Sequence, residues 1–111
     1  MSLGSGTSAF PPLKKLRDAG VTLCTGSDGV RDTWGPYNSV DMLDRVKVLG
    51  YRSGFRRDEE VETLLDIATY SGAKVMCDTD YGLAVGCRAD LVVVAGDTPT
   101  EAVINLPPRS Y

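Results

Sequence analysis

The sequence predicts an α/β fold that this chain does not complete on its own. Helix-forming stretches are interspersed with two apolar, β-branched stretches, at residues 21–25 and 90–95. The first stretch lacks the alternation of apolar and polar residues, which is typical of a strand buried on both faces of a parallel sheet. No neighbouring stretch offers such a strand its parallel partners. We therefore expect a piece of a larger α/β protein rather than a closed domain.

The first predicted helix covers residues 12–19. Pro12 suits the first helical position, Leu13 and Leu16 share one face, and Gly20 supplies the stop. Residues 21–25 then form the predicted strand.

Residues 26–37 read as a loop, because glycine, proline and polar residues are concentrated there. A second helix is predicted from Ser39, as the N-cap, to residue 49, with Gly50 at its end. Its expected core positions are Val40, Leu43, Val46 and Leu49.

Asp58 is the expected N-cap of a third helix, since three glutamates follow it near the positive end of the helix dipole. The buried stripe of that helix is predicted at Val61, Leu64, Leu65 and Ala68. Residues 71–76 add a further turn, and residues 80–86 are rich in turn formers. The strongest strand signal lies at 90–95, a short helical turn begins at 98–101, and two prolines end the pattern at 107–108.

Composition excludes several classes of protein. Of the 111 residues 42% are apolar and 24% charged, which are ordinary globular values and argue against intrinsic disorder. The longest apolar run, residues 91–95, is far shorter than the roughly 20 residues of a membrane span. The net charge of −3 disfavours nucleic acid and anionic membrane as partners. The chain has no histidine, so it cannot by itself build a histidine metal site or a histidine-dependent catalytic pair.

The cysteines and the N-terminus favour a cytoplasmic location. Cys24, Cys77 and Cys87 are an odd set without a CxxC pair, so neither a disulfide framework nor a zinc cluster is indicated. We expect Cys24 to be a small core residue inside the first strand. Residues 1–8 lack the apolar segment of a secretory signal, and residues 1–9 are expected to be a tail that could derive from a cloning vector.

The loop at residues 25–37 carries the chemistry, because it directly follows the buried strand, where α/β proteins place their sites. Gly26 and Gly29 flank Asp28 and would let a ligand approach the backbone. The same Ser27-Asp28-Gly29 sequence is also typical of a solvated turn. Local chemistry alone leaves both interpretations open.

The order of motifs resembles the metal-dependent amidohydrolase superfamily in its cytosine-deaminase-like branch. Gly26-Ser27-Asp28 and residues 32–36 (Asp-Thr-Trp-Gly-Pro) are similar to the end of the last barrel strand and the loop after it. Residues 16–21, 41–43, 68–73 and 81–93 continue the resemblance, which covers residues 10–111. It implies the last βα portion of a (β/α)8 barrel at residues 10–78 and a truncated return into a small β-sandwich at 79–111. The barrel would be incomplete.

The resemblance also assigns roles to three residues. Asp28 would bind or face a divalent metal, zinc or iron, and serve as general base toward water. Asp32 and Trp34 would line the pocket of a small heterocyclic substrate such as cytosine, the indole by stacking and the carboxylate by accepting from ring N–H groups. Since the family's histidines have no counterpart here, we expect the isolated chain to be inactive and free of metal. Truncated strand edges would favour a homo-oligomer.

A second interpretation keeps the chain outside catalysis. It would then be a non-catalytic α/β module that binds a partner or small ligand. The arginines at 52, 56 and 57 are expected on a solvated turn. The tyrosines at 51, 70 and 81 are expected in the core or at an interface rather than as catalytic acids.

Overall fold

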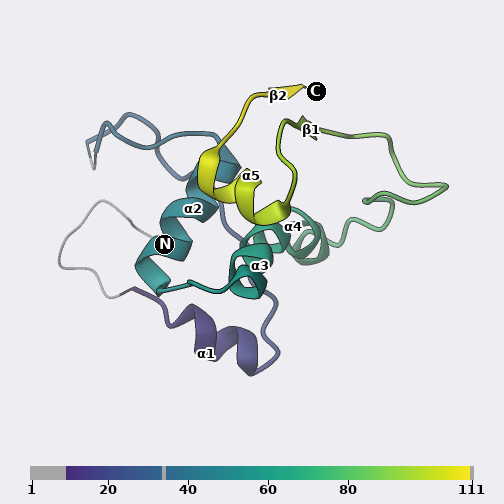
Figure 1. Cartoon of the computed structure of the whole chain (residues 1–111). Coiled ribbons are helices and arrows are strands. Elements are labelled where there is room, and N and C mark those ends of the chain that lie inside the picture. The colour runs from purple at the N-terminus through teal and green to yellow at the C-terminus, as the bar shows by residue number, and fades with distance from the viewer. Residues whose placement is uncertain (1–9, 34, 111) are drawn as a thin grey trace.

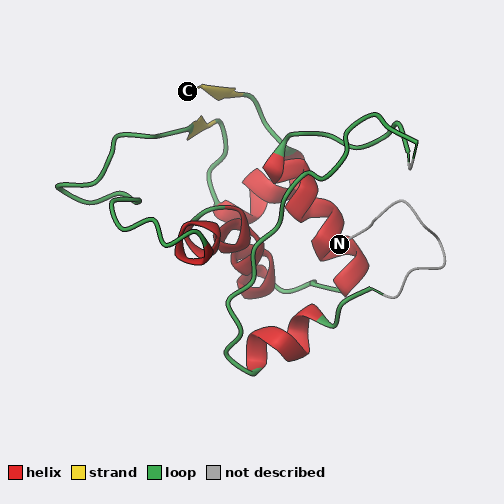
Figure 2. Cartoon of the chain, turned by 180° about the vertical axis from the view of Figure 1, so that it is seen from behind, coloured by secondary structure: helices red, strands yellow, loops and turns green. Residues whose placement is uncertain are grey.

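The computed structural model describes residues 10–33 and 35–110. These residues form five helices and one two-stranded antiparallel sheet. The helices are α1 (Leu13–Asp18), α2 (Met42–Ser53), α3 (Asp58–Ala68), α4 (Tyr70–Val75) and α5 (Pro99–Asn105), and the strands are β1 (Val93–Val94) and β2 (Arg109–Ser110). Helices α2, α3 and α5 gather at the centre, with α1 below them in Figure 1. Two long loops, α1–α2 and α4–β1, extend outward on opposite sides (Figures 1 and 2).

The core lies between the central helices. The largest fully buried side chains, each at most 2% exposed, are Val46, Leu49, Leu64 and Val103. They come from α2, α3 and α5, so the predicted stripes of the second and third helices are largely confirmed. Val40 is an exception, because α2 begins only at Met42 and leaves the Val40 side chain 71% exposed.

Helix α2 begins and ends later than the sequence predicts. Asp41, not Ser39, is its N-cap, and the Asp41 carboxylate accepts a hydrogen bond from the Leu43 N–H at 3.0 Å. The helix ends at Ser53, and Gly54 follows as its C-cap with a left-handed φ of 70°. Gly50, the expected end, instead allows α3 to pack closely: a Cβ there would lie 2.3 Å from Leu64 Cδ1.

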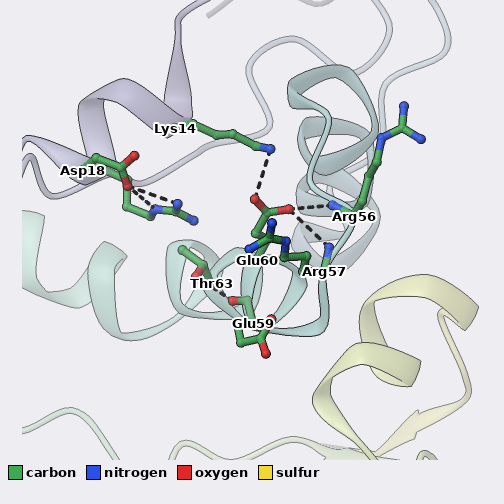
Figure 3. Close-up of polar contacts among 8 residues, drawn as sticks. Lys14, Asp18, Arg56, Arg57, Glu59, Glu60 and Thr63 are labelled. Atoms are coloured by element: carbon green, nitrogen blue, oxygen red, sulfur yellow. Dashed lines mark hydrogen bonds and ion pairs between the residues drawn. The ribbon is translucent and has the colours of Figure 1, made fainter.

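The Glu60 side chain caps the N-terminus of α3 and contacts α1 (Figure 3). Its carboxylate accepts from the backbone N–H of Arg56 at 2.8 Å and of Arg57 at 3.2 Å, and it pairs with Lys14 Nζ at 3.0 Å. The Arg56 N–H, then Lys14 and the Arg57 N–H, lower the pKa of Glu60 from 4.5 to about 2. Asp58, the predicted N-cap, is the first helical residue, and Arg57 precedes the helix.

The predicted strand at residues 21–25 is absent from the structure. The segment is an irregular stretch in which Val21 is 47% exposed and Cys24 is also exposed, so the expectation of a buried Cys24 is wrong as well. The Val21 N–H donates to Leu16 O in α1, a hydrogen bond of the kind found at helix C-termini. A strand requires a hydrogen-bonded neighbour, and the described residues supply none for this segment.

The second predicted strand is much shorter than residues 90–95. Only Val93–Val94 pairs, antiparallel to Arg109–Ser110, with Val93 opposite Ser110. The Ala95 N–H also donates to Pro108 O at 3.0 Å, which extends the contact between the two segments by one bond. Arg109 also forms a two-pronged ion pair with Asp41, with both N···O distances at 2.5 Å, which ties β2 to the start of α2. This arginine lowers the pKa of Asp41.

The α4–β1 loop is organised around Arg88. Its guanidinium pairs with Asp78 at 2.5 Å, Asp90 at 3.2 Å and Asp80 at 3.4 Å. The Arg88 N–H also donates to Asp80 O at 2.9 Å. Surface ion pairs contribute little each, and the apolar side chains of Leu83 and Val85 are exposed, so this loop is only weakly stabilised.

Three remaining predictions concern surface residues and the chain start. The arginines at 52, 56 and 57 are exposed, as predicted, but Arg52 lies on α2 and not on a turn. Tyr70 and Tyr81 contact each other edge-to-face at 5.5 Å, whereas Tyr51 is 90% exposed and is not a core residue. The predicted tail at 1–9 lies outside the described residues. Within the described residues, each helix is too short or too polar to cross a membrane.

Candidate active site

Asp28 occupies a strained turn in the α1–α2 loop. Its φ of 53° is left-handed, a conformation that costs a residue with a side chain roughly 1–2 kcal/mol, although aspartate adopts it more often than most residues. The Asp28 side chain is exposed. Its carboxylate is therefore available to a ligand, provided that other contacts hold the turn in place.

Helix α2 and the residues just before it supply those contacts. Arg45 Nη2 donates to the Ser27 carbonyl at 2.5 Å, and Asn38 Nδ2 donates to the Gly29 carbonyl at 2.6 Å. Arg45 Nη1 in turn donates to Asn38 Oδ1 at 3.5 Å. The carbonyls of the residues on either side of Asp28 are thus held by one connected pair of side chains.

Asp32 returns to the same turn. Its N–H donates to Gly35 O at 3.4 Å in an antiparallel bridge that folds the loop back on itself. Its carboxylate lies directly against Gly29, where an added Cβ would be 1.6 Å from Asp32 Oδ2. A side chain at position 29 would require the Asp32 carboxylate to move, and Asp32 is thus placed beside the residue that follows Asp28. Trp34, the third predicted site residue, lies outside the described residues.

Asp28 can serve as one ligand of a metal ion. An exposed carboxylate on a fixed turn has the chemistry of a zinc or iron ligand. Catalytic zinc sites use about three protein ligands, and no group of three or more histidine, cysteine or acidic side chains able to hold a metal exists in residues 10–33 and 35–110. The described residues fit one position of a metal site, not the whole site.

Arg45 and Asn38 are not among the residues that the sequence predicts for the site. Arg45 is the one charged residue among the buried side chains of the described chain, with 7% of its surface exposed. The available signal was its position: Arg45 lies four residues before Leu49, on the side of the predicted helix that packs inward. An arginine at such a position indicates a buried polar contact, but not with which residue.

Comparison with known proteins now identifies the group to which the chain belongs. Residues 4–106 match the model of the amidohydrolase family. The chain belongs to this family. The match covers the Asp28 turn, the Asp32 bridge and all of the helical core.

Two proteins similar to this chain are named for N-isopropylammelide. The N-isopropylammelide isopropyl amidohydrolase of Pseudomonas sp. (strain ADP) is 32% identical over 102 residues, covering 91% of this chain and 25% of the relative. The crystal structure of N-isopropylammelide isopropylaminohydrolase from Burkholderia multivorans is 42% identical, with a TM-score of 0.87 over 96% of this chain and 27% of its own.

A third similarity concerns the fold alone. The 5-methylcytosine deaminase of Klebsiella pneumoniae is 24% identical and has a TM-score of 0.84 over 96% of this chain and 27% of its own. The chain therefore shares its fold with part of a deaminase of the predicted branch. It spans about a quarter of the length of the relatives it matches.

Proposed function

We propose that this chain is the C-terminal portion of a metal-dependent amidohydrolase that hydrolyses a C–N bond of a small heterocycle, with Asp28 as its general base. The observation that carries the proposal is the similarity, at 42% identity over 96% of the chain, to the N-isopropylammelide isopropylaminohydrolase structure. The Asp28 turn, exposed and held from α2, supports the assignment of the base.

Asp28 would move one proton in two steps. Its carboxylate accepts a proton from the attacking water as oxygen bonds to the ring carbon. It then returns that proton to the leaving nitrogen as the C–N bond breaks, so that the amine or ammonia departs neutral. A divalent metal, when bound, lowers the pKa of a water molecule from about 15.7 to about 7. Residues of the full-length enzyme outside this chain would supply its other ligands.

Asp32 and Trp34 would orient the heterocycle. The Asp32 carboxylate, which lies against Gly29, is close enough to the Asp28 turn to accept from a ring N–H while the base acts. The indole of Trp34 would stack on the planar ring. Cytosine, isoguanine, a triazine and a hydantoin-like ring all offer such N–H groups.

The two relatives named for N-isopropylammelide favour a substrate that carries an exocyclic amine. The likeness to 5-methylcytosine deaminase adds support for the fold only. We therefore place N-isopropylammelide ahead of cytosine in the order of candidate substrates.

A substrate panel tests this proposal. The full-length enzyme that carries this segment is loaded with zinc or iron and incubated with N-isopropylammelide, cytosine, isoguanine and hydantoin, and the released amine or ammonia is measured. We expect turnover of at least one compound, fastest with N-isopropylammelide, and none by the isolated 111-residue chain. If the full-length enzyme turned over none of these compounds, the non-catalytic binding module would be favoured. Turnover by the isolated chain would refute the proposal that the chain holds only part of the active site.

A further inference from the structure

We propose that Arg45 is a positioning residue that fixes the Asp28 carboxylate by donating to the Ser27 carbonyl on one side of it and by orienting Asn38, which donates to the Gly29 carbonyl on the other. The inference rests on the proposed role of Asp28 as general base. Arg45 itself lies on α2 and is buried, so it acts through the turn and not on the substrate.

The contacts of Arg45 converge on the turn. One guanidinium nitrogen, Nη2, donates to Ser27 O across 18 residues of sequence. The other, Nη1, donates to Asn38 Oδ1, which orients the Asn38 amide so that its Nδ2 donates to Gly29 O at 2.6 Å. A planar guanidinium suits this task, because its donors keep a fixed angle to one another. One side chain thereby sets two carbonyls that bracket Asp28.

The burial of Arg45 is hard to explain by stability alone. Its hydrogen-bond acceptors, Ser27 O and Asn38 Oδ1, are uncharged, and its Nε is buried without a hydrogen-bond partner among the described residues. Burying a charge without a paired carboxylate is costly, and an apolar side chain of similar size is often as stable or more so. Arg45 therefore contributes a geometry that an apolar residue cannot provide.

That geometry is the left-handed backbone at Asp28. A φ of 53° persists only where surrounding contacts over-determine it. If the two carbonyls were released, residue 28 would relax toward negative φ and move its carboxylate. A displacement of about 1 Å at a catalytic group can cost about 100-fold in rate.

The test compares two arginines of the same helix in the full-length, metal-loaded enzyme. Arg45→Met removes both contacts and keeps an apolar side chain in the core. Arg52→Met is the matched control, since Arg52 lies on the same helix but is exposed and lies over the Phe10 ring at 4.8 Å. For each variant, kcat and KM are measured, and the φ angle of residue 28 is determined by crystallography.

We expect Arg45→Met to lower kcat by about 100-fold with KM within about threefold of wild type, and residue 28 to leave the left-handed region. Arg45→Lys keeps one charged nitrogen that can donate, so its kcat should lie between that of Arg45→Met and that of the wild type. Asn38→Ala, which frees Gly29 O and removes the acceptor of Arg45 Nη1 but leaves the bond from Arg45 to Ser27 O, should lower kcat in the same direction and tests the inference even if Arg45→Met does not fold. Arg52→Met should match wild type in kcat and in the φ of residue 28.

Asp28→Asn separates this inference from the function on which it rests. If Arg45→Met and Asn38→Ala keep the wild-type kcat and the left-handed residue 28 while Asp28→Asn is inactive, the positioning role is overturned and the proposed base stands. If Asp28→Asn is fully active, the proposed base is wrong, and with it the role of Arg45 in catalysis.

Discussion

The helical core differs from the extended segments in how its side chains are buried and its backbone is hydrogen-bonded. The core is formed by α2, α3 and α5, and the extended segments are residues 21–37 and 77–92. The helices bury apolar side chains against one another, and Leu64 is only 2% exposed. The extended segments also carry apolar side chains, yet Val21 is 47% and Leu83 80% exposed. A helix satisfies its backbone internally, whereas a strand needs a neighbour. The extended segments are also the ones that resemble a barrel strand and the return into a sandwich.

The largest difference between the two regions should appear on truncating matched leucines. Leu64→Ala removes a core side chain and opens a cavity against Gly50, so we expect it to destabilise the chain by about 3 kcal/mol. Leu83→Ala should change the free energy of unfolding by less than about 0.5 kcal/mol. Urea denaturation followed by circular dichroism measures both. Equal losses for the two variants would show that the extended segments are packed as tightly as the core.

A smaller, pH-dependent effect should mark the junction of α1 and α3. Because the pKa of Glu60 falls from 4.5 to about 2 on folding, its ionised form stabilises the folded state above pH 4.5, and this contribution is lost as pH falls toward 2. Glu60→Gln should therefore lower the unfolding midpoint at pH 6, and the gap to wild type should close as the pH is lowered through that range. Glu62→Gln, on the exposed side of the same helix, is the control. A gap for Glu60→Gln that stays constant from pH 6 to pH 2.5 would contradict the contacts of Glu60 described here.

Helix positions could be predicted from the sequence because their signals are local. Apolar spacing predicts the buried positions of Val46 and Leu64 correctly, but it places the end of α2 at Gly50, four residues too early. That glycine is explained by the approach of Leu64 from α3, which no local pattern contains. The strand at 21–25 was predicted from composition, and the structure lacks it because the described chain offers it no partner.

The candidate site was predicted only in part, for the same reason. Asp28 could be predicted because glycines flank it, and both Asp28 and Asp32 belong to short motifs that resemble those of a known family. The structure places the Asp32 carboxylate against Gly29. Arg45 is 18 residues from Ser27, and its contact depends on how α2 docks beneath the turn. Long-range polar contacts of this kind follow from packing and not from a short motif.

The most direct test of the account is the kcat of Asp28→Asn in the full-length, metal-loaded enzyme, measured beside Asp32→Asn. Asparagine keeps the size of the side chain and the tolerance for left-handed φ but cannot accept the proton. We expect kcat of Asp28→Asn to fall by about 1,000-fold or more, whereas Asp32→Asn should mainly raise KM. Wild-type kcat in Asp28→Asn would contradict the assignment of Asp28 as general base.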